Sequence, residues 1–154
     1  MKALKGILGF IPAAAWMGMI YYFSSVPADD STVQSMSVTE QIIEIYTHIT
    51  GASEVKLSSW VISVEPHVRK LAHMSEYALL FILLFIAFRF YIKSYRKNVL
   101  ISFLICVLYA CTDEWHQTFI EGRAGMPVDV LIDACGVMIV IVIFYFIRKH
   151  LQRV

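Results

Sequence analysis

Charged residues are scarce in this chain. Asp, Glu, Lys and Arg make up 16% of the sequence, against roughly a quarter in an ordinary soluble domain. Hydrophobic residues reach 58%, and the mean hydropathy is +0.66. This composition excludes a typical soluble globular protein. The net charge of +1 gives no information about a nucleic-acid partner, and we expect none.

Period-two alternation of polar and apolar residues is absent from the long apolar runs, which argues against strands. Each run approaches the roughly 20 residues that a helix needs to cross a hydrocarbon core of about 30 Å. We therefore predict one domain over residues 1–154, an all-α integral membrane protein with four transmembrane helices. The predicted spans cover residues 4–23, 71–91, 99–120 and 126–147.

The first run also allows a cleavable signal peptide, with Lys2 and Lys5 ahead of an apolar stretch. Its apolar part covers residues 6–23 and is longer than the roughly 7–15 residues of a signal core, which favours a retained helix. The cysteines Cys106, Cys111 and Cys135 lack metal-ligand spacing, and we interpret them as small buried hydrophobic residues.

Acidic residues are missing from one of the two sides that four spans would define. That side collects nine of the thirteen Lys and Arg residues, and the other side collects all twelve Asp and Glu residues. The positive-inside rule counts only the basic residues, and it predicts that both termini and the loop at residues 93–98 are cytoplasmic. Residues 24–70 and 111–133 then face outward in the cell membrane.

The first outward segment contains a short amphipathic pattern at residues 37–50. Ser37, with Glu40 three residues later, fits a capping box at the start of a helix. Its apolar residues recur at spacings of three and four: Ile42, Ile45, Tyr46 and Ile49. We predict a helix lying on the outer membrane surface or against the bundle. Pro66 suits the first position of the next helix, which would continue into the second span.

The stretch from residue 111 to 133 places seven ionisable side chains between two apolar runs. At 1.5 Å per residue, Asp113 lies about 22 Å above Asn98, and Asp133 lies about 22 Å above Arg148. Both then lie just below the outer boundary of a core of about 30 Å. Ionisable groups at such depths usually face a bundle interior or a water-filled cavity. We predict a polar cavity that opens outward.

Residues on three helices share this height and these polar faces. The candidates for acid–base or catalytic roles are His73, Glu76, Tyr77, Asp113, Glu114, His116, Asp129 and Asp133. The candidates for ligand binding are Lys70, Gln117 and Arg123, since Lys and Arg suit a lipid phosphate. The acidic and histidine side chains also suit a divalent metal, although no HExxH or comparable motif is present. A buried hydrogen-bond network that only packs the bundle uses the same residue types.

Three motifs stand in a familiar order: "RKLAHMSEYALL", "YACTDEWHQTFIEGRAG" and "DVLIDACG". Together with the opening "YYFSSVP", they resemble the VanZ-like family, which is named for a teicoplanin-resistance protein. The likeness covers nearly the whole chain. The family pattern matches every candidate residue named above except Glu76, and it also matches Gly136. One departure is Glu121, which stands where the family pattern has proline. The resemblance implies a small multi-span membrane protein linked to lipoglycopeptide resistance, without assigning it a reaction.

Several functions are compatible with these patterns. The first is a cavity that binds or modifies an amphiphilic or lipid-linked ligand, with membrane lipids, a lipid-linked cell-wall precursor or a lipoglycopeptide as partners. The second is a small proton-coupled transporter, which the charge-free inner runs at residues 79–87 and 137–147 disfavour. The third is a structural protein whose polar cluster packs the bundle. Whether the chain is an enzyme stays open, and a divalent metal stays open as a cofactor.

Overall fold

The computed structural model describes residues 6–51 and 57–152, and the regular structure in these ranges is entirely helical. Its helices include α2 (Ile11–Ser24), α3 (Ala28–Thr50), α4 (Leu57–Phe88), α5 (Tyr95–Gln117) and α6 (Pro127–Leu151). Four stretches are long and apolar enough to cross a membrane: Gly6–Ser24, Ser59–Phe88, Tyr95–Gln117 and Pro127–Leu151. The prediction of an all-α membrane protein with four transmembrane helices is confirmed.

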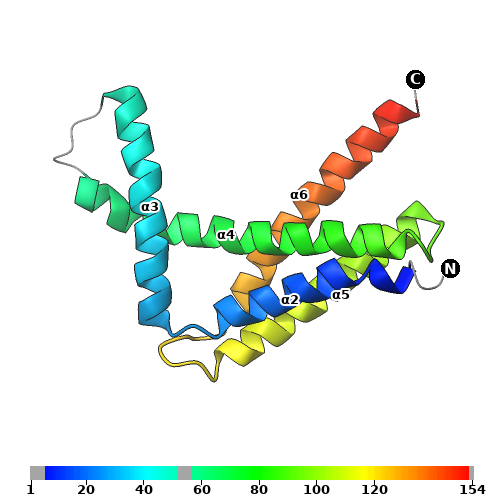
Figure 1. Ribbon diagram of the computed structural model, residues 1–154, viewed down its shortest axis with the longest axis horizontal. Coiled ribbons are helices and arrows are strands. Elements are labelled where there is room, and N and C mark those ends of the chain that lie inside the picture. Colours follow the sequence, from blue (N-terminus) through cyan, green and yellow to red (C-terminus); the bar gives the residue numbers. More distant parts are fainter. Residues whose placement is uncertain (1–5, 52–56, 153–154) are drawn as a thin grey trace.

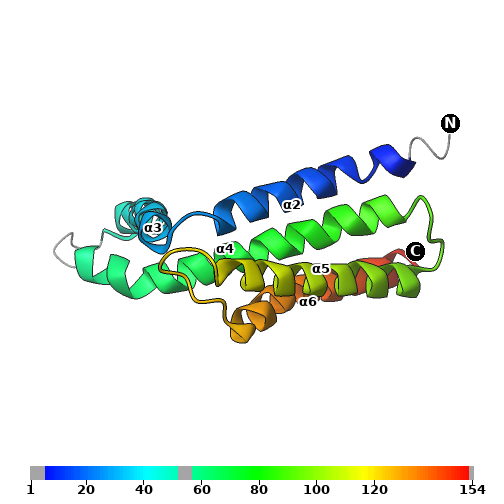
Figure 2. The ribbon, with the colours of Figure 1, turned by 90° about the horizontal axis from the view of Figure 1, so that it is seen from below.

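Helix α4 is central, because it contacts α2, α3, α5 and α6. Figures 1 and 2 show α2, α4 and α5 running side by side, α6 crossing α4 obliquely, and α3 lying across α4. The start of the first span, the α4–α5 loop and the end of α6 lie at one end of the bundle. Helix α3 and the α5–α6 loop lie at the other end, as four alternating crossings require.

The amphipathic helix in the first connection is longer than predicted. It begins at Ala28, so the capping box at Ser37 was wrong, because Ser37 lies inside α3. Asp29 and Asp30 occupy its first turn, where negative charge interacts favourably with the helix dipole. The helix ends at Thr50, and its C-cap residue Gly51 has a φ of 69°, a conformation that glycine adopts readily.

Helix α3 has one face buried against the protein and, next to it, an exposed apolar stripe. Thr39 and Ile43 are buried toward the rest of the protein. A second stripe remains exposed: Val38, Ile42, Ile45 and Ile49. A helix that lies across the bundle and exposes an apolar stripe suits the surface of a bilayer, where that stripe enters the headgroup region. The contact with α4 confirms the alternative in which this helix packs against the bundle, whereas its place on the outer membrane surface stays a prediction.

Helix α4 contains 32 residues and is therefore about 48 Å long, which exceeds a hydrocarbon core of about 30 Å. The predicted start at Pro66 was wrong, because Pro66 lies inside the helix. The extra turns reach α3, where the Ser35 hydroxyl donates a hydrogen bond to the Glu65 carboxylate. The second span thus carries a helical extension that holds α3 against the bundle.

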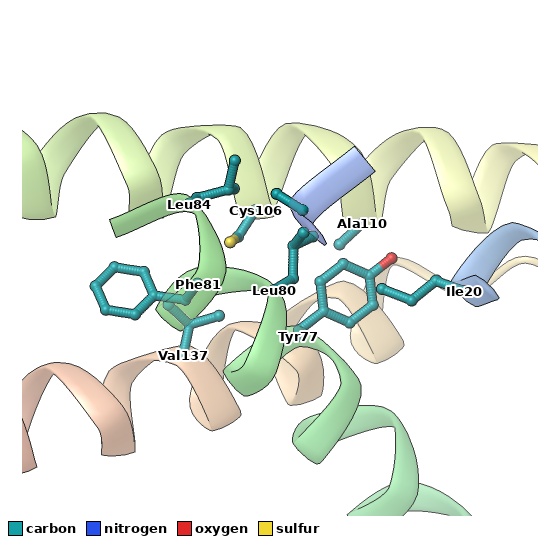
Figure 3. Packing of buried hydrophobic residues seen from close by; sticks show 9 residues of the cluster. Ile20, Tyr77, Leu80, Phe81, Leu84, Cys106, Ala110 and Val137 are labelled. Atoms are coloured by element: carbon teal, nitrogen blue, oxygen red, sulfur yellow. The ribbon is translucent and has the colours of Figure 1, made fainter. Parts of the chain in front are cut away.

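The apolar core lies around the second half of α4. Figure 3 shows α4 side chains meeting residues of α2, α5 and α6; the labelled set is Ile20, Tyr77, Leu80, Phe81, Leu84, Cys106, Ala110 and Val137. Cys106 is buried as predicted, whereas Cys111 and Cys135 are exposed on the outside of the bundle. The interpretation of these two cysteines as buried was wrong, because their helix faces point away from the other helices.

Candidate ligand-binding site

Two adjacent cavities, of about 250 and 210 Å³, lie where α3, α4 and the α5–α6 loop meet. Both are lined by Ser31, Arg69, His73 and Arg123, and we refer to them together as the polar cavity. Six of the eleven predicted site residues line it: Lys70, His73, Glu76, Gln117, Arg123 and Asp129. Arg69 and Ser31 were not among the predicted residues. Arg69 stands directly beside Lys70, and this adjacency was the available signal for it.

Arg123 is held by backbone carbonyls rather than by carboxylates. Its Nε donates to the Val26 carbonyl oxygen at 2.8 Å, and its Nη2 donates to the Phe23 carbonyl oxygen at 3.2 Å. The Phe23 carbonyl lies in the last turn of α2, where it also accepts from the Val26 N–H, and the Val26 carbonyl lies two residues beyond the helix. Lys70 likewise has no carboxylate within ion-pair distance in the described part of the chain. The hypothesis that Arg123 and Lys70 pair with the acidic cluster was therefore wrong.

Glu114 fixes the start of α6. Its Oε2 accepts a hydrogen bond from the Met126 backbone N–H at 2.8 Å, and Met126 is the N-cap residue of α6. A carboxylate at this position satisfies an unpaired donor and interacts favourably with the helix dipole. A Cβ on Gly125 would lie 2.0 Å from the Glu114 carbonyl oxygen, so only glycine allows the loop to approach this closely.

The α5–α6 loop is thus tied to the surrounding helices at several points. In addition to the Arg123 and Glu114 contacts, the Ala28 N–H donates to the Glu121 carbonyl oxygen at 3.1 Å. Gly122, with φ of 72°, makes the turn between Glu121 and Arg123. Glu121 contributes its backbone carbonyl to this contact. The turn therefore forms without the proline that the family pattern has at this position. These ties position the Arg123 side chain in the cavity wall.

The α4 part of the wall contains a histidine–carboxylate pair. The His73 Nδ1 and the Glu76 Oε2 are 3.4 Å apart, one helical turn from each other. One turn earlier, the Arg69 Nε lies 4.0 Å from the Glu65 carboxylate. Because Arg69 is half-exposed, this pair adds little stability and leaves most of the guanidinium donors free.

Four of the other predicted residues are buried between helices instead of lining the polar cavity. Gln117 bridges two of them, donating from its Nε2 to Asp113 at 3.2 Å and to Glu114 at 3.4 Å. Tyr77 is fully buried and Asp133 is 3% exposed. Among the described residues, neither the Tyr77 hydroxyl nor the Asp133 Oδ1 has a hydrogen-bond partner. Buried polar groups are rarely left without a hydrogen bond in folded proteins, so these two atoms are unusual.

His116 lies in a separate place, between α5 and α2. Its Nε2 is 3.1 Å from the Ser25 hydroxyl, and its ring stacks on Tyr21 at a centroid distance of 4.6 Å. The Ser25 hydroxyl is also 2.7 Å from the Tyr21 carbonyl oxygen, to which it donates. His116 therefore joins the end of α2 to α5, and it lines a cavity of about 250 Å³ together with Asp113.

Metal-ligand geometry is not found in the described residues. Within residues 6–51 and 57–152, no three His, Cys, Asp or Glu side chains come close enough together to hold a metal ion. The candidates His73, Glu76 and Asp129 therefore share the cavity wall without forming a ligand set.

The charges on the wall favour an anion. Arg69, Lys70 and Arg123 supply three firm positive charges, against the two carboxylates Glu76 and Asp129. Burial lowers the pKa of the Arg123 guanidinium, nearby Asp113 opposes that change, and the positive charge of Arg69 lowers the pKa further. Arginine stays protonated despite such a shift, so two guanidiniums repel each other beside the same cavity.

The fold defines a class: an integral membrane protein with four helical spans, joined by one helix that lies across the bundle. Its family follows from a further comparison. The VanZ/LLP1 family model matches residues 10–148, nearly the whole chain, and the chain belongs to that family. No curated protein and no solved structure matches the chain.

Proposed function

We propose that the polar cavity binds the anionic headgroup of an amphiphile, such as a phosphorylated or glycosylated lipid. The observation that carries this proposal is the convergence of Arg69, Lys70 and Arg123 on one cavity with only two facing carboxylates. Arginine and lysine side chains donate charge-assisted hydrogen bonds to phosphate and carboxylate oxygens. His73 would contact the same headgroup, because it lines both parts of the cavity.

An apolar wall supports an amphiphile over a soluble anion. Val38, Val68 and Ala72 line the part of the cavity between α3 and α4. Val38 belongs to the exposed apolar stripe of α3, so the cavity continues into a surface suited to acyl chains. A lipid could then place its headgroup among the bases while its tails stay in the bilayer.

We further propose that this cavity faces outward and that both termini are cytoplasmic. The opposite end of the bundle carries most of the basic residues, which the positive-inside rule assigns to the cytoplasm. Family membership then suggests a role in resistance to lipoglycopeptides, with a lipid-linked cell-wall precursor or the amphiphilic antibiotic itself as the ligand. An outward-facing headgroup site would meet either one.

The orientation can be tested by labelling cysteines in intact cells. Exposed Cys111 and Cys135 are first replaced by alanine, and single cysteines are placed at Gln41 on α3 and at Ser94 in the α4–α5 loop. We expect a membrane-impermeant thiol reagent to label the cysteine at position 41 and to leave the one at position 94 unlabelled until the cells are permeabilised. Labelling at position 94 alone would reverse the proposed topology.

The binding proposal can be tested with Lys70→Gln, because Lys70 lines the cavity and has no carboxylate partner among the described residues. We expect about a tenfold weaker affinity for short-chain phosphatidylglycerol, equivalent to roughly 1.4 kcal/mol. Tryptophan fluorescence in a nonionic detergent is the readout, since the Trp16 indole donates to the Glu76 carbonyl oxygen at 2.9 Å beside the cavity. Lys97→Gln, which removes one charge at the opposite end, is the matched control.

Unchanged affinity in Lys70→Gln would reject the headgroup site. Equal losses in Lys70→Gln and Lys97→Gln would mean that net charge, rather than the cavity, attracts the lipid. A transport function has less support, because Leu80, Phe81 and Leu84 fill the bundle between Tyr77 and its basic end with closely packed apolar side chains (Figure 3). Between Tyr77 and that end, the spans contain no charged residue, and a path for ions or protons would need one.

A further inference from the structure

A second cavity region lies at the opposite end of the bundle, where α4 ends, α5 begins and α6 ends. It consists of two cavities of about 630 Å³ each, which share Lys93, Tyr95, Arg148 and Gln152. We refer to them together as the basic groove. Each volume falls within the roughly 300–1,000 Å³ of typical small-ligand sites.

The groove is lined by five basic side chains and by no acidic one: Arg89, Lys93, Arg96, Arg148 and Lys149. The sequence has no Asp or Glu between Glu76 and Asp113, and none after Asp133. No ion pair within the described residues involves any of the five. Within the part of the chain that the structure describes, no carboxylate offsets their mutual repulsion, and an anion bound among them would relieve it.

Aromatic side chains hold one of these basic residues, Arg148, in a fixed position. The Arg148 guanidinium lies 4.3 Å from the centroid of the Tyr95 ring, as a cation–π contact. Phe85 packs edge-on against both Tyr95 and Phe144, at centroid distances of 5.8 and 5.2 Å. The Tyr95 hydroxyl is buried and has no hydrogen-bond partner among the described residues. The groove thus combines a preorganised cation, an available hydroxyl donor and an apolar floor.

The apolar floor continues onto the surface that faces lipid. Phe144 and Ile147 line the groove, and Ile147 and neighbouring Phe146 on α6 are more than half exposed. A soluble anion would use only the basic rim, whereas a lipid would also cover these side chains with an acyl chain. The basic rim and the apolar floor thus lie next to each other, as a lipid headgroup and its acyl chain do.

We propose that the basic groove is a second lipid site, which binds the phosphate of an anionic phospholipid from the leaflet at this end of the bundle. Arg148 and Lys93 hold the phosphate oxygens, the Tyr95 hydroxyl donates to them, and Phe144 and Ile147 contact the first part of an acyl chain. Basic pockets between transmembrane helices commonly recognise anionic headgroups in this way. The site is separate from the polar cavity and does not depend on the function proposed there.

The test counts bound lipids by native mass spectrometry, with phosphatidylglycerol titrated into delipidated protein in a nonionic detergent. We expect Arg148→Gln to weaken one binding event about tenfold or more, because it removes a charge-assisted contact. Lys93→Gln, in the loop, provides a second variant with little consequence for helix packing. Lys97→Gln removes a neighbouring charge that does not line the groove, and should leave binding unchanged.

Three further measurements identify what the groove binds. Glycerol phosphate should compete poorly, and equal binding of this soluble anion would reject a lipid site. Phosphatidylcholine should bind at least tenfold more weakly, and equal binding would reject recognition of net negative charge. Lys70→Gln should leave the event lost in Arg148→Gln intact. Loss of lipid binding in Lys70→Gln alone would reject the groove and support the polar cavity. Loss of lipid binding in Arg148→Gln alone would support the groove and reject the polar cavity.

Discussion

Replacing Gly136 with alanine is expected to destabilise the protein by about 3 kcal/mol, the upper part of the range for overpacked cores. A Cβ at this position would lie 2.1 Å from the Met74 carbonyl oxygen and 2.7 Å from the carbonyl carbon. Both atoms belong to the α4 backbone, which cannot rotate aside as a side chain does. The two helices must therefore move apart along the most extensive helix contact of the bundle.

The measurement is the unfolding temperature in detergent, where this loss corresponds to a decrease of about 6–12 °C. Gly18→Ala is the matched control, because a Cβ there would meet nothing within 4 Å. That substitution should be neutral or slightly stabilising, since alanine is the better helix former. Wild-type stability of Gly136→Ala would show that α4 and α6 do not cross as closely as described.

A second effect of Gly136→Ala would follow in the polar cavity. His73 directly precedes Met74 on α4, and Asp133 lies one turn before Gly136 on α6. Separation of the two helices would open the buried surroundings of Asp133 to water. We therefore expect weaker headgroup binding in this variant in addition to its lower stability.

Much of the fold was predictable because its main determinant is the length of apolar runs. A run that must cross about 30 Å of hydrocarbon has few structural options, and each predicted span corresponds to a helix. The first turns of α3 escaped prediction because residues 28–36 are mostly small and polar and carry no apolar period. Helix α3 forms there because hydrogen bonds with distant segments hold it, as at Ala28 and Ser35.

Pro66 misled the prediction for a different reason. A proline usually begins or breaks a helix, because it lacks the N–H that would bond to the carbonyl four residues earlier. Here that carbonyl belongs to Ile62, which is 65% exposed on the extension of α4. Near the membrane boundary such a carbonyl is within reach of water, so the helix continues through the proline.

The candidate site was only partly predictable. Counting residues from the basic ends placed the polar side chains at the same end of the bundle, and six of them line one cavity. Helix periodicity could not tell that Asp113 and Asp133 face neighbouring helices, because that depends on the rotation of each packed helix. It also could not show that Arg123 bonds to carbonyls 97 and 100 residues earlier in the chain.

Those backbone contacts lead to the second large expected effect: Arg123→Lys should be nearly as damaging as Arg123→Ala. The guanidinium reaches the Val26 and Phe23 carbonyl oxygens from two different nitrogen atoms, at 2.8 and 3.2 Å. A lysine ammonium is a single point and cannot reproduce this fork. Lysine can replace at most one of these two contacts, and alanine replaces neither. The Val26 contact is part-buried and the Phe23 contact is exposed, so we expect a loss of about 1 kcal/mol, at the lower end of the range for a lost hydrogen-bond partner.

The loss should also reach the polar cavity, because Arg123 links the α5–α6 loop to α2 and lines both parts of the cavity. We expect phosphatidylglycerol affinity to fall about tenfold in Arg123→Lys and slightly more in Arg123→Ala, where the charge is lost as well. Unfolding temperature and tryptophan fluorescence, measured on the same samples, separate the two contributions. Resistance of expressing cells to a lipoglycopeptide, at matched protein levels, extends the test to the proposed role.

Arg69→Lys is the control that isolates geometry from charge. Arg69 lines the same cavity, but its one ion pair, to Glu65 at 4.0 Å, is half-exposed and contributes little. Lysine preserves its charge and should bind the headgroup almost as well, with an unchanged unfolding temperature. If Arg123→Lys also behaved like the wild type, only a positive charge would be required at that position. The forked contact with the end of α2 would then have no part in shaping the site.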